Sequence, residues 1–380
     1  MDSKKYNNTK LFIGITKGIF SFILLFLFVM LGYSLRLEEF IRFHTQNNYL
    51  VFIIYVFAIG IFSSILFAPV NFYTGFYLEH KYNLSNQTFK KYVLENLKSM
   101  MVGLVIGVPI LLLFFFILNQ FEDLWWLVFA SAMFLISVVL SQIFPILIMP
   151  IFYKITPLND DELKARITKL AKGAGITVQN VFSFNMSKNT KKANAAFTGL
   201  GKTKRIILGD TLLNDYTKDE IETVIAHELG HYKYKHIQKN ILFGTAASFL
   251  TFFLISLLYK LSISWFDFNN ILQIAALPVL SLWAMLIGLV QTPIGNILSR
   301  KYEYEADRYA VESTLKPQSF ISTLNKLTDQ NLGDRKPHPF VEWFFYSHPS
   351  VKNRINALEK FAEAKGIVEL KKEQLAEASD

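Results

Sequence analysis

The sequence has no cysteine and little charge for its length. None of its 380 residues is Cys, and Asp, Glu, Lys and Arg make up only 18% of them, against about 25% in an average soluble protein. Without Cys the chain can form neither a disulfide scaffold nor a thiolate metal site, so any metal site must be built from His, Asp and Glu. Aromatic residues make up 15% of the chain, which excludes a disordered protein.

Hydrophobic residues make up 52% of the chain and occur in long runs. A membrane-spanning helix needs about 20 mostly apolar residues, because it crosses about 30 Å of hydrocarbon at about 1.5 Å per residue. The stretches that meet this requirement are Leu11–Tyr33, Leu50–Phe72, Met100–Leu118, Leu124–Met149, Ile241–Tyr259 and Ile271–Ile297. The sequence therefore predicts a mostly α-helical, multi-pass membrane protein with about six spans, four of them in residues 1–153 and two in residues 241–297.

The basic residues indicate which side of the membrane each connection occupies. The net charge is +9, and Lys residues concentrate before the first span and after the second. The connections at Asn119–Asp123 and Ser262–Asn270 contain neither Lys nor Arg. The positive-inside rule then places both termini, and the segments 154–240 and 298–380, in the cytoplasm.

A further basic cluster lies between residues 188 and 205. In number it resembles a nucleic-acid-binding patch, but it lies beside the predicted membrane surface, where attraction to anionic lipid headgroups explains it. We therefore expect the lipid bilayer, and no nucleic acid, as the partner of these residues. The members of the cluster are Lys188, Lys191, Lys192, Lys202, Lys204 and Arg205.

The segment between the fourth and fifth spans is predicted to contain short helices and strands. Asp160–Ala174 has the pattern of a charged amphipathic helix, and Val178–Phe184 and Arg205–Leu208 have the pattern of strands. Thr217 and Glu220 fit a capping box, which predicts the start of a helix that runs on into the fifth span.

The run His227-Glu228-Leu229-Gly230-His231 has the spacing of a metal-binding helix. Residues four apart lie on one helical face, so both imidazoles can bind one zinc ion, with Glu228 beside it as a general base. The alternative is a chance pattern in a packed helix. A packed helix would bury three ionisable groups on one face, which is costly without partners, and the metal interpretation is therefore favoured.

A catalytic zinc needs a third protein ligand and one open position. Candidates follow the sixth span, where Glu303 and Asp307 share a helical face and Glu305 points roughly opposite. One of the two carboxylates can bind the metal, and the other can hold the free ring nitrogen of a ligating His. The alternative is an acidic, solvated helix face.

Together these features resemble the M48 family of integral-membrane zinc metalloproteases and, more narrowly, its CAAX prenyl protease 1 (Ste24-type) branch. The resemblance covers roughly residues 50–360 and does not rest on the metal motif alone. Further similar runs are Glu79–Thr88, Asn194–Phe197, Arg205–Leu213, Asp329–Gly333 and Tyr346–Pro349.

This resemblance implies a discontinuous, cytoplasmic, zincin-like α+β metalloprotease domain that holds one Zn²⁺ per chain. The implied zinc ligands are His227, His231 and Glu303, with Glu228 as the catalytic base and Asp307 supporting a ligand. We expect no other cofactor.

The resemblance also implies how a substrate is held. His348 is expected across the cleft, where it helps bind the substrate backbone or the developing oxyanion, with Arg354 nearby. Asn194 and Ala195 are expected in an edge strand that pairs with an extended substrate. His236, by contrast, is interpreted as an interfacial helix residue with no part in the site.

The implied function is a membrane-embedded metalloendopeptidase that removes the C-terminal tripeptide from prenylated substrates. One alternative is a membrane quality-control protease similar to the HtpX branch, and an alternative of another class is a non-catalytic metal-binding transporter or scaffold. We expect a peptide or protein substrate, with or without a lipid, and the oligomeric state stays open. A bacterial inner or plasma membrane is favoured over an ER membrane, since the chain ends Glu377-Ala378-Ser379-Asp380 without an ER-retention signal.

Overall fold

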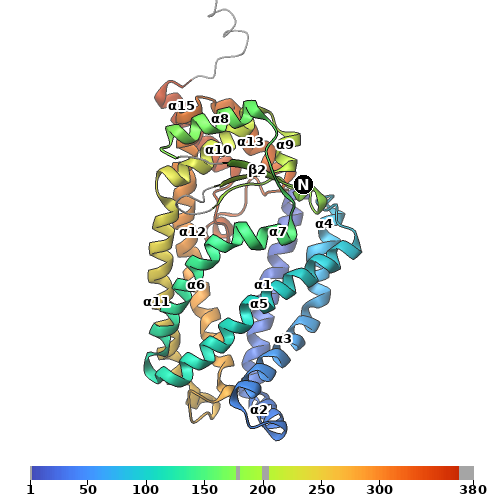
Figure 1. The fold of residues 1–380 in the computed structure, drawn as a ribbon, viewed down its shortest axis with the longest axis vertical. Coiled ribbons are helices and arrows are strands. Elements are labelled where there is room, and N and C mark those ends of the chain that lie inside the picture. The colour runs from blue at the N-terminus through green and yellow to red at the C-terminus, as the bar shows by residue number, and fades with distance from the viewer. Residues whose placement is uncertain (1, 177–179, 199–204, 368–380) are drawn as a thin grey trace, which may run out of the picture.

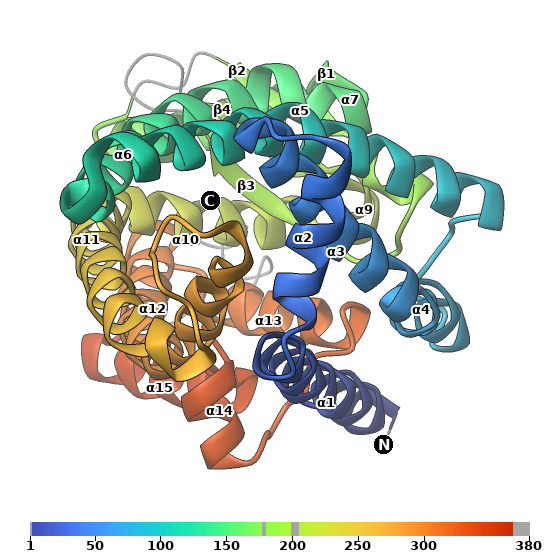
Figure 2. The ribbon, with the colours of Figure 1, turned by 90° about the horizontal axis from the view of Figure 1, so that it is seen from below.

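Long helices run along the protein, and the short helices and a small sheet gather at one end (Figure 1). The computed structural model describes residues 2–176, 180–198 and 205–367. The N-terminus lies at the same end as the sheet (Figure 1). Seen along the long axis, the long helices lie around the periphery, with β3 and α10 between them (Figure 2).

Five continuous helical stretches of the described chain are long and apolar enough to cross a membrane. They are Asp2–Met30, Asn48–Lys81, Phe89–Phe152, His236–Phe266 and Ile274–Thr314. Most of the apolar surface of these stretches is not buried inside the protein, as expected for helices whose solvent is lipid. The protein is therefore an integral, multi-pass membrane protein.

The number of stretches differs from the six spans predicted, because two predicted spans fall in Phe89–Phe152, which has 64 residues. Helices α5 (Phe89–Phe121) and α6 (Trp125–Ile143) are joined only by the 3₁₀ turn Glu122–Leu124, so no loop interrupts the stretch. The backbone reverses there, at Glu122 with φ of 34°, and the two helices meet in a hairpin (Figure 1). At about 1.5 Å per residue, the stretch is about 96 Å long, enough for two crossings.

The other long helices are α1 (Asp2–Met30), α3 (Asn48–Phe72), α11 (His236–Ser262) and α12 (Pro278–Thr314). Helix α12 has 37 residues and runs without a break from the membrane region to the sheet end of the protein. Its single internal proline, Pro293, does not end it. A residue near the C-terminal end of α12 is therefore joined to the membrane region by one continuous helix.

The four-stranded sheet has the order β1-β2-β4-β3. Its strands are β1 (Ile155–Pro157), β2 (Asn180–Phe184), β3 (Ala195–Thr198) and β4 (Arg205–Gly209). Strands β2 and β4 confirm the two strands predicted from sequence, although residues 177–179 lie outside the described chain. Strand β3 pairs with β4 in antiparallel register and forms an edge of the sheet.

Several shorter helices also belong to the fold. They are α4 (Leu78–Lys81), α8 (Asp161–Gly173), α9 (Asp210–Asp215), α10 (Lys218–Lys233), α13 (Pro317–Gln330), α14 (Pro339–Phe345) and α15 (Val351–Lys365). A common apolar core joins α8, the sheet and α10, with Ile167, Leu208 and Leu229 fully buried. Helix α12 packs against α10. The segment before the fifth span and the segment after the sixth span therefore form one unit.

Candidate metal centre and cleft

Helix α10 carries the predicted metal motif and begins with the predicted capping box. The Thr217 hydroxyl accepts a hydrogen bond from the Glu220 amide, and the Glu220 carboxylate accepts one from the Thr217 amide. The apolar residues Ile221, Ile225 and Leu229 lie buried on one side of this helix. The packing of that side fixes the direction of the remaining side, which carries the motif.

A close helix crossing at Gly230 brings α12 against the motif. A Cβ atom added at Gly230 would lie 2.9 Å from the Cα atom of Ala306 and 3.1 Å from its carbonyl oxygen. Only glycine permits this approach. The crossing lies one helical turn from Glu303, and it places this carboxylate beside the two histidines of α10.

The side chains of His227, His231 and Glu303 face one another and form a triangle. His227 Nε2 and His231 Nε2 lie 3.2 Å apart. Glu303 Oε1 lies 3.3 Å from His231 Nε2, and Glu303 Oε2 lies 3.5 Å from His227 Nε2. Ligand atoms about 2.0–2.1 Å from a tetrahedral zinc lie about 3.3 Å from one another. The buried Glu303 Oε2 also has no hydrogen-bond partner among the described residues, so the donor set fits a metal ion.

Asp307 lies behind His227, on the side away from the triangle. Its Oδ1 atom lies 2.8 Å from His227 Nδ1, and the residue is only 1% exposed. The Arg354 guanidinium donates two hydrogen bonds to this carboxylate, of 2.8 and 2.5 Å. Asp307 therefore occupies the place expected of a group that supports a ligating imidazole, while the charge of Arg354 is directed at Asp307.

The surroundings shift the pKa values of two neighbouring groups of α10, Glu228 and His227. Burial raises the pKa of the Glu228 carboxyl above its ordinary value. Burial lowers the pKa of His227, but the neighbouring Asp307 and Glu303 carboxylates outweigh burial and raise it to about 10. A carboxylate with a raised pKa is better suited to accept a proton near neutral pH.

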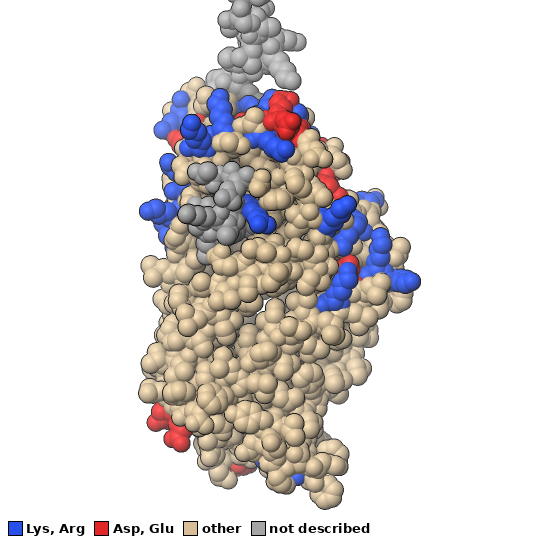
Figure 3. All heavy atoms as spheres, viewed as in Figure 1, with Lys and Arg blue, Asp and Glu red and all other residues tan. Residues whose placement is uncertain are grey.

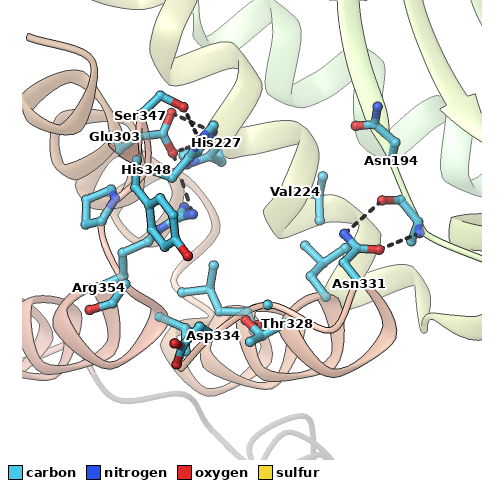
Figure 4. A pocket seen from close by; sticks show the side chains of 18 of the residues that line it. Asn194, Val224, His227, Glu303, Thr328, Asn331, Asp334, Ser347, His348 and Arg354 are labelled. Atoms are coloured by element: carbon cyan, nitrogen blue, oxygen red, sulfur yellow. Dashed lines mark hydrogen bonds and ion pairs between the residues drawn. The ribbon is translucent and has the colours of Figure 1, made fainter. Parts of the chain in front are cut away.

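A cleft of about 570 Å³ opens beside the triangle (Figure 4). It is lined by seven of the nine predicted site residues, which are Asn194, Ala195, His227, Glu228, Glu303, His348 and Arg354. The other two, His231 and Asp307, lie behind this lining and belong to the cluster through the contacts given above.

His348 and Asn194 lie on different sides of the cleft (Figure 4). The His348 side chain is 65% exposed, and its Nε2 atom lies 3.5 Å from Glu303 Oε1. Its Nδ1 atom is within 3.0 Å of the Ser347 hydroxyl. Asn194 directly precedes the edge strand β3, so the cleft runs between that edge and His348.

Asn331 is a cleft residue that the sequence does not identify. Its side chain accepts a hydrogen bond from the Ala193 amide at 3.0 Å and donates one to the Ala193 carbonyl at 3.3 Å. This pair fixes the backbone just before β3 (Figure 4). In the sequence, Asn331 belongs only to the run Asp329–Gly333, which contributes to the family resemblance and has no assigned role.

The interpretation of His236 as an interfacial residue is wrong. His236 is 1% exposed, and its Nδ1 atom lies 3.0 Å from His231 Nδ1. The helix predicted to run on into the fifth span instead breaks at Lys235, which has φ of 58°, and α11 begins anew at His236. This break turns His236 back toward the metal motif.

Comparison with known proteins decides the family. The profile of Peptidase family M48 matches residues 157–362, which include every residue of the triangle. The chain belongs to the M48 peptidase family. A second profile, the CAAX prenyl protease N-terminal region with five membrane helices, matches residues 1–154 of this M48 protein.

Two curated relatives and one crystal structure cover nearly all of the M48 chain. It is 32% identical to CAAX prenyl protease 1 of Saccharomyces cerevisiae, covering 86% of this chain and 76% of the relative. It is 30% identical to the uncharacterized metalloprotease YhfN of Bacillus subtilis, covering 94% and 85%. The crystal structure of S. mikatae Ste24p superposes with a TM-score of 0.83 at 28% identity, covering 94% and 88%.

These comparisons confirm a membrane-embedded metalloprotease and the resemblance to the Ste24-type branch. The family implies a bound metal, and His227, His231 and Glu303 are the described residues that fit one. The alternative of a non-catalytic transporter or scaffold receives no support.

Proposed function

We propose that this protein is a zinc metalloendopeptidase that removes the C-terminal tripeptide from prenylated proteins or peptides. The observation that carries the proposal is the triangle of the His227, His231 and Glu303 side chains, which approach one another to 3.2, 3.3 and 3.5 Å, at the wall of a cleft that Glu228 also lines. The name of the yeast relative, CAAX prenyl protease 1, supports the substrate class.

His227, His231 and Glu303 hold one zinc ion per chain. When bound, zinc lowers the pKa of a water molecule and polarises the carbonyl of the peptide bond to be cleaved. Glu228 takes the proton from the attacking water and delivers it to the leaving amine. His348, which is exposed to the cleft near Glu303, donates a hydrogen bond to the developing oxyanion.

The edge strand β3 binds the substrate as an added strand. An extended peptide pairs with the backbone near Asn194 and Ala195, and Asn331 keeps this backbone in place through its two bonds to Ala193. Main-chain pairing makes binding depend little on substrate side chains. Arg354 contributes through Asp307 and not by direct contact with the substrate, since its guanidinium is directed at that carboxylate.

The cleft faces the cytoplasm of a bacterial cell. Lys and Arg gather at the end of the protein that carries the sheet, and the broad middle of the surface has hardly any charge (Figure 3). The positive-inside rule assigns the basic end to the cytoplasm. The similarity to the Bacillus subtilis protein over 94% of this chain supports a bacterial plasma membrane.

Replacement of the Glu228 carboxylate by an amide tests the mechanism. Glu228→Gln keeps the size of the side chain but removes the base, so cleavage of a farnesylated peptide in proteoliposomes should fall about 10²–10⁴-fold while the zinc content stays unchanged. Glu359→Gln, at an exposed position on α15, is the matched control and should cleave like the wild type. Retained cleavage by Glu228→Gln would refute the mechanism.

The same assay separates the two substrate classes. A peptide of identical sequence without the prenyl group should be cleaved at least about tenfold less efficiently, because burial of the isoprenoid stabilises its binding by about 0.8 kcal/mol per CH₂ group. Equal cleavage of both peptides would instead favour the alternative of a membrane quality-control protease.

A further inference from the structure

His236 and Glu305 form a polar chain that ends on one of the proposed zinc ligands. His236 Nδ1 lies 3.0 Å from His231 Nδ1, and His236 Nε2 lies 2.9 Å from Glu305 Oε2. His231 reaches the triangle with its other nitrogen, Nε2. The chain therefore runs from Glu305 through His236 to the back of His231.

The surroundings of His236 hold its ring in one orientation. The ring stacks on Tyr302, with centroids 4.1 Å apart and planes 11° from parallel. It is presented by the turn at Lys235, a non-glycine residue in the left-handed backbone region with φ of 58°. Tyr302 and Glu305 both belong to α12, the helix that also carries Glu303.

We propose that His236 and Glu305 are positioning residues that fix the ring and the proton of His231 for metal binding. This inference rests on the zinc site of the proposed function and adds two residues to it. Neither residue is a ligand of the same ion, because His236 faces Nδ1 of His231 while the triangle lies at Nε2.

The arrangement of donors and acceptors leads to this role. A carboxylate only accepts hydrogen bonds, so the Glu305 carboxylate requires a proton on His236 Nε2. A neutral His236 then has an acceptor at Nδ1, which requires a proton on His231 Nδ1. That proton leaves the Nε2 lone pair of His231 free for the metal.

The two proposed histidine ligands thereby receive the same kind of support by different routes. His227 Nδ1 lies directly beside the Asp307 carboxylate, while His231 reaches the Glu305 carboxylate through one intervening imidazole. Support of a ligating His by a carboxylate commonly changes metal affinity 10–100-fold.

Zinc affinity of the full-length protein, measured by competition with a chromophoric chelator, tests this inference. His236→Phe keeps a ring on Tyr302 but loses both nitrogens, and Glu305→Ala loses the carboxylate. Each should weaken zinc binding 10–100-fold, and the double variant should bind no more weakly than His236→Phe alone, because both act through one chain. Glu312→Ala, at an exposed position of the same helix, should bind like the wild type.

Rescue separates positioning from packing. The amide of His236→Gln can accept from His231 and donate to Glu305, so its affinity should return to within a few-fold of the wild type. Wild-type affinity in His236→Phe or Glu305→Ala, additive losses in the double variant, or a Gln variant as weak as Phe would each overturn the inference. If His236→Phe does not fold, Glu305→Ala and His236→Gln still decide it. Failure of the wild type itself to bind zinc would refute the proposed metal instead.

Discussion

Buried charges at the metal centre are stable only because each has a partner. Asp307 and Arg354 are almost completely buried, with side-chain exposures of 2% and 13%, and each satisfies the other. Arg354 Nη1 also lies 3.6 Å from Glu303 Oε2, so its charge is shared between two carboxylates. Removal of one member of a buried pair leaves the other unpaired, which costs far more than the pair contributes.

Substitution of Arg354 should therefore destabilise the protein strongly. Arg354→Met leaves the buried Asp307 carboxylate without its guanidinium partner, and the free energy of unfolding should fall by about 3–5 kcal/mol. The control is Arg335→Met, since Arg335 bonds to both oxygens of Asp329 in the same two-pronged way but at an exposed position. That pair should contribute less than about 1 kcal/mol.

Denaturation in detergent compares the two arginine variants. Equal stability of Arg354→Met and Arg335→Met would contradict a structural role for Arg354. In that case the direct contact with substrate that the family resemblance implies would be the better account of this residue.

The relative positions of two residues could be predicted from the sequence where both lie on one helix and their spacing alone decides whether they share a face. The spacings of four between His227 and His231, and between Glu303 and Asp307, predict shared faces, and the structure agrees. The place of His236 does not follow from spacing, because a left-handed Lys235 has no sequence signal and an unbroken helix would direct position 236 elsewhere. The contact of Asn331 with Ala193 joins residues 138 apart in the chain, a separation that no local pattern spans.

At the scale of elements, the centre depends on how closely α10 and α12 cross. Helix α10 supplies two of the proposed ligands and α12 the third. Gly230 removes the side chain that would hold the helices apart. A shift of a few tenths of an ångström between them would change all the distances to Glu303.

Gly230→Ala should accordingly disturb both stability and metal binding. The added methyl group has no space between α10 and α12, so overpacking should cost about 1–3 kcal/mol, and zinc affinity should fall with it. Gly295→Ala on α12 is the control, because its Cβ would have no neighbour within 4 Å. Thermal unfolding and zinc titration of both variants check this expectation.

Unchanged zinc affinity in Gly230→Ala, with stability equal to that of Gly295→Ala, would show that the close crossing is not needed to assemble the site. A loss of stability without a loss of zinc affinity would show that the proposed ligand side chains can adjust to a small shift between α10 and α12.

The sequence predicts the elements better than their junctions. Apolar runs locate the long helices, because length and hydropathy alone make a span. The connection expected at Asn119–Asp123 is present, and it is reduced to the short turn Glu122–Leu124 between α5 and α6. At the other junction, α10 and α11 are separate helices although the sequence predicts one. Both junctions contain a non-glycine residue with positive φ, Glu122 in the first and Lys235 in the second.

At the scale of the molecule, membrane helices bring two distant segments of sequence into one catalytic unit. The motif at His227 and the proposed ligand Glu303 are separated by α11 and most of α12, which leave the sheet end and return to it (Figure 1). The first helix also reaches this end, where Glu79 of α4 accepts hydrogen bonds from Tyr6 and Lys10 and pairs with Lys192. The membrane region thus positions both halves of the site.

The zinc content of the purified full-length protein tests the central claim most directly. The wild type should contain about one zinc per chain, and Glu303→Ala, purified in parallel, should contain almost none, although it keeps both histidines of α10. If Glu303→Ala instead retains one zinc per chain, the two segments do not share a metal, and the proposed centre is wrong.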